Sequence, residues 1–352
     1  MTVLALRALG LGDLLTGLPA LRGLRAALPD RRIVLGAPRW LEPVARLSGA
    51  LDAVVDTAPL AVPAVRAPEL AVNLHGRGPE STAALRATRP RRLWAFGLPD
   101  GPAYQVAGPV DGAWHVEHET RRWCRLLAWY GVPCDPGDLR LPRPVPSASA
   151  PDTPFAPCGN PATRRGLVIV YPGGAAPARR WPPERWAAVA RELSTAGWPV
   201  AITGGRQEVD VARHVARLAG LPETSVLAGR TDLLGLCALV CDAALLLAAD
   251  TGVGHLATAY GTPSVLLFGP VAPAEWGPPA SRPIHRSLWS GRPGDPRATS
   301  PDPGLLALTV DEVTRAAVDL LEVSPPVVPA DGKGAQVRRG TGQRPCAGRA
   351  SA

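Results

Sequence analysis

Several short segments of the sequence combine glycines with charged side chains, and each follows a run of apolar residues. The first is Gly10-Leu11-Gly12-Asp13, which follows the apolar run Thr2–Arg7. A glycine loop between a buried strand and a helix places backbone N–H groups and a carboxylate at the C-terminal edge of a sheet, where α/β proteins bind ligands. Asp13 then either caps its helix or faces a cleft as a general base. A dinucleotide site would need a third glycine where Leu15 stands, which disfavours a nicotinamide enzyme.

The second segment carries cations. Gly173 and Gly174 follow another apolar run, and Arg179 and Arg180 precede a predicted helix that begins at Pro182. Helix N–H groups and guanidinium groups both donate to phosphate oxygens, so this arrangement favours a phosphate site. The alternative is an ordinary loop with solvated arginines.

The third segment is Asp250-Thr251-Gly252-Val253-Gly254-His255, which follows the predicted strand Ala243–Ala249. Asp250 can accept hydrogen bonds from sugar hydroxyls, and the Thr251 and Gly252 amides lie at the start of the next helix. His255, one turn further on, is more often a hydrogen-bonded structural residue than a catalyst. In a fourth loop, Glu208 either caps its helix or takes a ribose diol.

Composition narrows the classes of function. The chain has 352 residues, of which 46% are hydrophobic and 19% charged, so most of it can fold around a core. The net charge is +8, but only one of the 38 basic residues is a lysine, and no RNA-binding or zinc-finger pattern accompanies them. An acidic small ligand such as a nucleotide diphosphate is therefore a better partner than a nucleic acid. The six cysteines include no C-x-x-C, and no signal-peptide pattern is present, which indicates a cytoplasmic protein.

These loops must be positioned by two alternations of strands and helices. We predict an N-terminal Rossmann-like domain over residues 1–145, a Pro-rich linker over 146–165 and a second Rossmann-like domain over 166–322. A disordered Pro/Gly/Arg-rich tail follows over 323–352. A single helix is predicted from Leu14 to Leu28. Two such halves facing one another imply a ligand cleft between them, which is a GT-B-like architecture.

Taken together, the segments resemble glycosyltransferase family 9, the lipopolysaccharide heptosyltransferase family, over about residues 2–322. The resemblance is carried by Leu9–Asp13 with Leu18–Leu21, Pro172–Gly174 with Arg180–Trp186, Gly204-Gly205 with Glu208, Asp250–His255, Gly261–Pro263 and Phe268–Pro270. It implies a GT-B fold, an inverting mechanism that requires no metal, and ADP-heptose as the typical donor.

The resemblance also implies roles for single residues. Asp13 matches the base that deprotonates the acceptor hydroxyl, and Arg179 falls near a lysine that commonly contacts the donor diphosphate. Glu208 matches a ribose contact and Asp250 a contact to the donor sugar. Thr251 and Gly252 match backbone donors to the phosphates. The full predicted donor site is Gly173, Gly174, Arg179, Arg180, Glu208, Asp250, Thr251, Gly252 and His255.

The acceptor, a glycan or glycolipid, is expected on the N-terminal half beside Gly12, His75 and Arg77. No metal or other cofactor is expected; His115 and His118 have no further His/Cys cluster beside them. Two other functions stay open: a nucleotide-sugar epimerase or hydrolase of the same architecture, and a non-catalytic nucleotide-sugar-binding protein. The basic tail either is a solvated extension or holds the chain at the inner face of a membrane, and its five basic residues over 29 favour the solvated extension.

Overall fold

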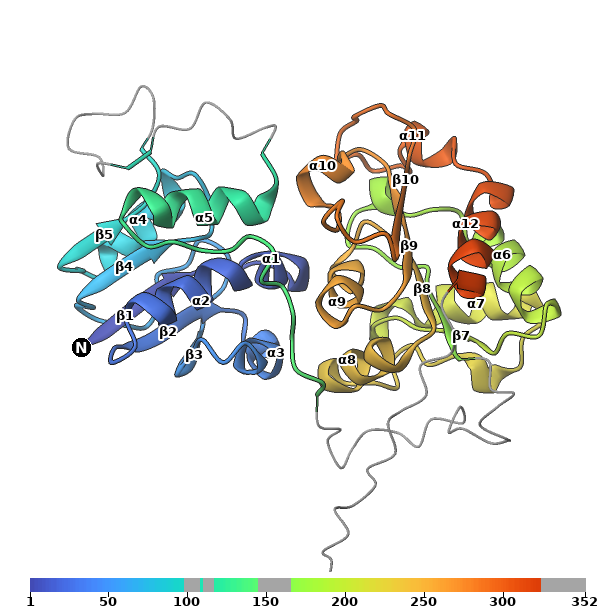
Figure 1. Cartoon of the computed structure of the whole chain (residues 1–352), viewed down its shortest axis with the longest axis horizontal. Coiled ribbons are helices and arrows are strands. Elements are labelled where there is room, and N and C mark those ends of the chain that lie inside the picture. Colours follow the sequence, from blue (N-terminus) through green and yellow to red (C-terminus); the bar gives the residue numbers. More distant parts are fainter. Residues whose placement is uncertain (98–107, 110–116, 145–165, 324–352) are drawn as a thin grey trace, which may run out of the picture.

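Two α/β halves lie side by side in the computed structural model of the chain (Figure 1), which describes residues 1–97, 108–109, 117–144 and 166–323. The predicted linker over 146–165, His115 and all of the predicted tail except Val323 lie outside these ranges. The predicted linker and tail, and the domain boundaries that depend on them, stay predictions.

The first half is built on a parallel sheet in the order β3-β2-β1-β4-β5. Its strands are β1 (Thr2–Leu6), β2 (Arg32–Ala37), β3 (Ala53–Asp56), β4 (Leu70–Asn73) and β5 (Arg92–Trp94). Its helices are α1 (Leu11–Thr16), α2 (Leu18–Ala27), α3 (Glu42–Leu47), α4 (Glu80–Ala87) and α5 (Glu119–Trp129). The apolar run at the N-terminus becomes β1 in the middle of this sheet, because only a strand covered on both faces can bury such a run.

The second half repeats the plan with a parallel sheet in the order β10-β9-β8-β6-β7. Its strands are β6 (Val168–Tyr171), β7 (Val200–Ile202), β8 (Leu245–Ala249), β9 (Ser264–Phe268) and β10 (His285–Trp289). Its helices are α6 (Pro183–Thr195), α7 (Val209–Ala219), α8 (Leu233–Asp242), α9 (Gly252–Tyr260), α10 (Pro273–Trp276), α11 (Pro303–Leu306) and α12 (Val310–Val323). Every residue of β8 and β9 is buried, which fits their place in the interior of the sheet.

The single helix predicted from Leu14 to Leu28 is wrong. The chain forms two helices that meet at Gly17, with α1 beginning earlier, at Leu11. Pro19 explains the break, because proline has no N–H to donate to the carbonyl four residues before it. The break leaves α1 as a separate short helix that presents Asp13 on its first turn.

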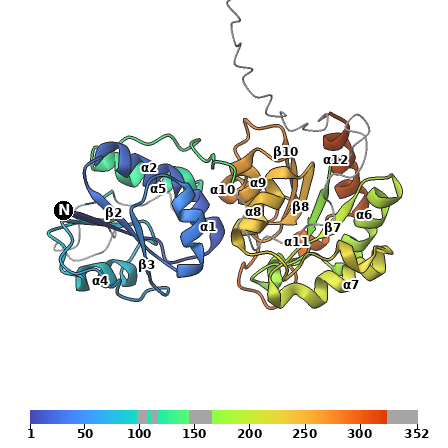
Figure 2. The same cartoon turned by 90° about the horizontal axis from the view of Figure 1, so that it is seen from below.

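The two halves meet mainly through α1 and α9, which face one another (Figure 2). A continuous buried apolar cluster includes Leu11 and Leu15 of α1 and Val253 and Leu256 of α9. The chain then passes to the second half, where the Leu141 N–H donates to the Ala259 carbonyl at 3.1 Å. Among the described residues, no helix is both long enough and apolar enough to span a membrane.

Candidate active site between the two halves

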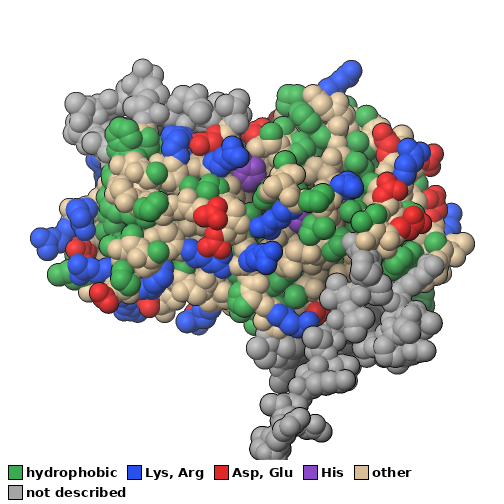
Figure 3. All heavy atoms as spheres, viewed as in Figure 1, with side chains coloured by type: hydrophobic (Ala, Val, Ile, Leu, Met, Phe, Trp, Pro, Cys, Tyr) green, Lys and Arg blue, Asp and Glu red, His purple; other side chains and the backbone are tan. Residues whose placement is uncertain are grey.

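The chemistry-bearing loops lie at the carboxyl ends of the two sheets. In the first sheet β1 lies between β2 and β4, and in the second sheet β6 lies between β7 and β8, so the strand order reverses at β1 and at β6. Ligands of open α/β sheets bind where the strand order reverses in this way. The loops after β1, β4, β6, β7 and β8, with the start of α9, carry the residues that the sequence singles out. Basic and His side chains also gather along the boundary between the halves (Figure 3).

Two glycines allow α1 and α9 to approach closely. A Cβ atom placed on Gly12 would lie 2.8 Å from Cδ2 of His255, and one placed on Gly252 would lie 3.0 Å from Cβ of Leu11. Both distances are shorter than ordinary van der Waals contact. The glycines are therefore needed for the present separation of the halves, and they bring the helix that carries Asp13 against the start of α9.

Asp13 both caps its helix and remains accessible. One carboxylate oxygen, Oδ2, accepts a hydrogen bond from the Gly10 N–H at 3.1 Å, while Oδ1 lies 3.9 Å from the Arg7 guanidinium. The side chain is 27% exposed. Burial raises the pKa of Asp13 above its usual value, Arg7 opposes that rise and Glu119 adds to it. A carboxylate with a raised pKa is a better proton acceptor, so the capping role and the predicted base role are compatible.

Arg7 is a buried cation that the sequence predictions missed as a site residue. It is 1% exposed and donates to the carbonyls of Asp13 and Leu74, to Thr16 Oγ1 at 3.0 Å and to Glu119 Oε1 at 3.0 Å. Its guanidinium also lies 4.9 Å from the centre of the Trp123 ring. The signal in the sequence is a charged residue at the end of an otherwise apolar strand, directly before the glycine loop.

Gly17 gives Arg7 its space, and Gly17→Ala is expected to lower the free energy of unfolding by about 1–3 kcal/mol. The new Cβ would lie 2.8 Å from Cδ and 2.9 Å from Nε of Arg7. Arg7 cannot move aside without breaking its buried hydrogen bonds. Urea denaturation of both proteins measures the effect, with Gly10→Ala as the control because a Cβ there meets nothing closer than 3.5 Å. An unchanged midpoint would show that the Arg7 side chain is not held as tightly as described.

In the second half, on the far side of the boundary from Asp13, Asp250 and Arg179 form an ion pair. Arg179 Nη1 lies 3.3 Å from Asp250 Oδ2, and the side chains are 30% and 5% exposed. Burial raises the pKa of Asp250, Arg179 opposes that rise, and the nearby Asp13 and Glu275 add to it. The loops that carry the two predicted carboxylates are adjacent, one from each half, because a Cβ atom placed on Gly252 would lie 3.1 Å from the Gly12 nitrogen.

The same loop contains two polar atoms that lack hydrogen bonds. Both atoms are buried: Asp250 Oδ2 has the ion pair with Arg179 but accepts no hydrogen bond, and Thr251 Oγ1 has no hydrogen-bond partner among the residues that the structure describes. Buried polar atoms are nearly always hydrogen-bonded, so atoms like these at a sheet edge are candidate ligand contacts. Thr251 is also the residue at which α9 begins, and its side chain does not cap the helix.

Glu208 lies against the glycine loop after β6. Its carboxylate accepts hydrogen bonds from the Gly174 N–H at 3.0 Å, the Gly205 N–H at 2.7 Å and the Tyr171 hydroxyl at 2.9 Å. Arg180 Nε donates to the Gly174 carbonyl at 2.8 Å. The structure therefore shows a local capping role for Glu208, and its predicted ribose contact stays a prediction. The phosphate roles of Gly173 and Gly174 also stay predictions.

The predicted histidines are held by local contacts. His255 packs edge-on against Trp276, with ring centres 6.1 Å apart, and burial lowers its pKa to about 4, so it is neutral near pH 7. His75 Nδ1 accepts from the Ala8 N–H at 3.1 Å, which ties the loop after β4 to the loop after β1. Arg77 lies in the same loop and is partly exposed. His75 is thus beside the Asp13 loop, and Arg77 follows it two residues later in the loop after β4.

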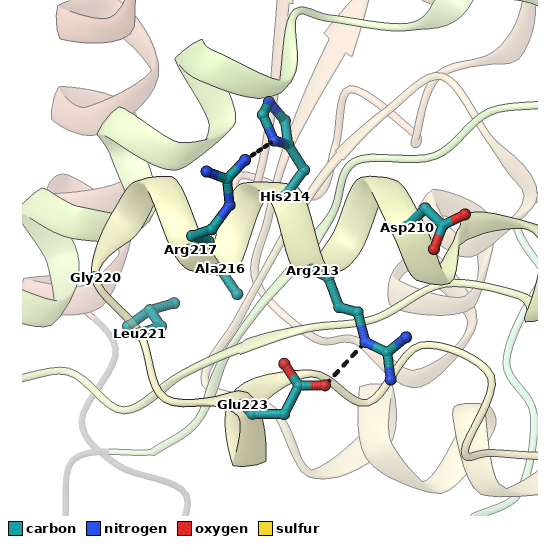
Figure 4. A pocket seen from close by; sticks show the side chains of 8 residues that line it. All are labelled: Asp210, Arg213, His214, Ala216, Arg217, Gly220, Leu221 and Glu223. Carbon is teal, nitrogen blue, oxygen red and sulfur yellow. Dashed lines mark hydrogen bonds and ion pairs between the residues drawn. The ribbon is translucent and has the colours of Figure 1, made fainter.

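A hollow outside this candidate site lies along α7 and the turn that follows it (Figure 4). Two of its arginines make side-chain hydrogen bonds within the lining, Arg213 with Glu223 at 2.9 Å and Arg217 with His214 at 2.8 Å. None of the predicted site residues lines it. Among the described residues, no group of three or more His, Cys, Asp or Glu side chains is placed to hold a metal ion. Metal independence nevertheless stays a prediction.

Comparison with known proteins agrees with this arrangement. The family described as glycosyltransferase family 9 (heptosyltransferase) matches residues 105–296, more than half of the chain. Lipopolysaccharide heptosyltransferase 1 of Pseudomonas aeruginosa is 30% identical over 183 residues, which make up 52% of this chain and 47% of that protein. The matched regions span less than half the length of the first curated relatives.

Solved structures share the fold. The glycosyltransferase family 9 protein from Veillonella parvula has a TM-score of 0.70 at 20% identity, over 92% of this chain and 97% of that one. The ADP-heptose lipopolysaccharide heptosyltransferase II of E. coli has a TM-score of 0.66 at 19% identity, over 92% and 99%. These similarities confirm the predicted GT-B-like α/β architecture. The family match over residues 105–296 shows that the chain belongs to glycosyltransferase family 9.

Proposed function

We propose that this protein is a glycosyltransferase that moves a sugar, expected to be heptose, from an ADP-sugar to a glycan or glycolipid acceptor. The observation that carries the proposal is the close contact of α1, which presents Asp13, with the start of α9, which directly follows the Asp250–Arg179 ion pair in the other half. Asp13 can accept a proton on one side of the boundary, and Arg179 lies on the other side beside a loop in which buried oxygens of Asp250 and Thr251 accept no hydrogen bond from the described residues. This arrangement suits transfer between two bound substrates. The names of the relatives support the choice of heptose and of a lipopolysaccharide-like acceptor.

In the proposed reaction Asp13 takes the proton of an acceptor hydroxyl as that oxygen attacks the anomeric carbon of the donor. The bond from that carbon to the diphosphate oxygen breaks, and ADP leaves with the electron pair. A single displacement of this kind inverts the anomeric configuration. It needs no covalent enzyme intermediate, because the nucleophile is the acceptor itself.

The leaving diphosphate gains negative charge, and the second half offers groups that stabilise it. Arg179 is partly exposed and can exchange its contact with Asp250 for a phosphate oxygen. The start of α9 presents the amides of Thr251 and Gly252, whose N–H groups suit the same oxygens. Asp250, released from Arg179, is then free to accept sugar hydroxyls. No step in this scheme uses a metal ion.

Nucleotide binding tests the donor site directly. We expect calorimetric titration with ADP, UDP and GDP to show binding of ADP that does not depend on magnesium. Arg179→Ala is expected to weaken ADP binding about tenfold or more, because hydrogen bonds to charged groups contribute about 1.5–3 kcal/mol. Arg191→Ala is the matched control, since this exposed arginine contacts only the Leu218 carbonyl among its described hydrogen bonds.

Three results would count against the donor site. Binding that requires magnesium would contradict metal independence, and equal losses in the two arginine variants would contradict the role of Arg179. The absence of binding for all three nucleotides would remove the donor site as a whole.

A further inference from the structure

The buried cation beneath Asp13 has two anionic neighbours at different distances. Arg7 Nη2 lies 3.0 Å from Glu119 Oε1 and 3.9 Å from Asp13 Oδ1. Glu119 is 5% exposed, and it also accepts from Trp123 Nε1 at 2.8 Å and from Arg122. The closer ion pair of Arg7 is therefore with Glu119 of α5, and Asp13 is the more distant of its two anionic neighbours.

This arrangement fixes the position of Asp13. Arg7 donates to the Asp13 carbonyl, to Thr16 at the end of α1 and to the Leu74 carbonyl after β4. The short helix α1 is thus tied to two strands of its own sheet and, through Glu119, to α5. Buried ion pairs add little net stability because desolvation offsets their attraction, so stability alone gives little reason to bury this one.

The pairing of Arg7 with Glu119 also determines how strongly the positive charge of Arg7 acts on Asp13. An uncompensated guanidinium 3.9 Å away would favour the ionised carboxylate and make it a poorer proton acceptor. Glu119 offsets that charge, because it lies closer to the same guanidinium nitrogen, Nη2, than Asp13 does. We propose that Arg7 and Glu119 are positioning residues for catalysis: Arg7 fixes the helix start that carries Asp13, and Glu119 offsets Arg7 so that Asp13 remains able to accept the acceptor's proton. This inference rests on the function proposed above.

Other ionisable groups surround the same place and are unchanged in the variants below. They are Arg122, which pairs with the second oxygen of Glu119, His75 in the loop after β4, His118 at the start of α5, and Arg179, Asp250, His255 and Glu275 in the second half. Burial lowers the pKa of His75 and His118 and raises that of Asp250. Arg7 and Glu119 also influence the pKa of His75, His118 and His255, so the site-specific titration of Asp13 described below assigns the shift to Asp13.

The pH dependence of kcat/KM separates this role from a merely structural one. Transfer requires ionised Asp13, so the rate rises as pH increases through its pKa. Glu119→Gln removes a negative charge, which lowers the pKa of Asp13 and moves the acidic limb of the profile to lower pH by about one unit. Arg7→Met removes a positive charge and is expected to move the same limb to higher pH by about as much. A loss of packing alone would not move the two profiles in opposite directions.

Two further variants serve as controls. Glu117→Gln makes the same substitution two residues away, where the carboxylate pairs with Arg125 at 2.8 Å, and is expected to leave the profile unchanged. Arg7→Lys keeps the charge but loses the guanidinium fork, so we expect an unshifted profile with a lower kcat. If Arg7→Met does not fold, Glu119→Gln and Arg7→Lys still decide the question.

A titration of the Asp13 carboxyl carbon by NMR, assigned with Asp13→Asn, gives the same shifts without turnover. A protein that transfers no sugar yet shows the two opposed shifts would overturn the proposed function while supporting the charge balance. Shifts in the same direction, no shift, or an equal shift in Glu117→Gln would overturn the inference itself.

Discussion

Replacing Asp13 by Asn is expected to lower kcat for sugar transfer by about 10³-fold, within the range that general bases contribute. The substitution keeps the shape of the side chain and an oxygen that can accept from the Gly10 N–H, so α1 should still begin at the same place. What it removes is the ability to take a proton from the acceptor hydroxyl. Initial rates at saturating donor and acceptor measure the loss.

Nucleotide binding is the control for this variant. The residues predicted to hold the diphosphate lie in the second half, so the Kd for ADP should change less than about twofold. An Asp13→Asn protein that keeps transfer activity would exclude Asp13 as the base. Equal losses of ADP affinity and of transfer would instead mean that the substitution disturbs the donor site.

Gly12→Ala is expected to reduce transfer by about 10²-fold, because the added methyl group separates the two halves. Its Cβ would lie 2.8 Å from Cδ2 and 3.2 Å from Nε2 of His255, and His255 packs against Trp276. Relief of that contact displaces α1 relative to α9, and misplacement of reacting groups by about 1 Å can cost two orders of magnitude. ADP binding should be retained, since the nucleotide site is expected within one half.

Two comparisons identify the cause of that loss. Gly10→Ala adds a methyl group two residues earlier, where the nearest atom is Asp13 Oδ2 at 3.5 Å, and should be nearly silent. In a double-mutant cycle, Gly12→Ala should add little to the loss caused by His255→Ala, because the smaller side chain leaves space for the methyl group. Additive losses would show that the contact between Gly12 and His255 is not the reason.

Much of the fold was predictable because its interior strands are continuous apolar runs, separated by loops that contain glycine, proline or charged residues. The runs that become β1, β8 and β9 are buried throughout or nearly so, and each is followed by a glycine or acidic loop at the sheet edge. Elements outside this pattern were missed. The edge strand β10 has the sequence His-Arg-Ser-Leu-Trp and mixed exposure, so no apolar run marks it.

The candidate site was predictable only in part, for a related reason. Residues in glycine loops, such as Asp13 and Asp250, are visible because the loop itself marks the sheet edge. Arg7 and Glu119 are far apart in sequence, and only the packing of α5 beside α2 in the first half brings them within 3.0 Å. Similarly, Glu208 accepts hydrogen bonds from Tyr171 and Gly174, which belong to a strand and a loop far from it in the sequence.

The most direct test of the central claim is a transfer assay with ADP-heptose in the presence and absence of a lipopolysaccharide inner-core acceptor, without added metal. ADP release is followed continuously, and the sugar products are identified by mass spectrometry and NMR. The account predicts that ADP release depends on the acceptor, that one heptose is added to it, and that the new bond has the inverted anomeric configuration. Free heptose or an epimerised sugar nucleotide formed without acceptor would contradict transfer, as would tight ADP-heptose binding with no turnover on any glycan acceptor.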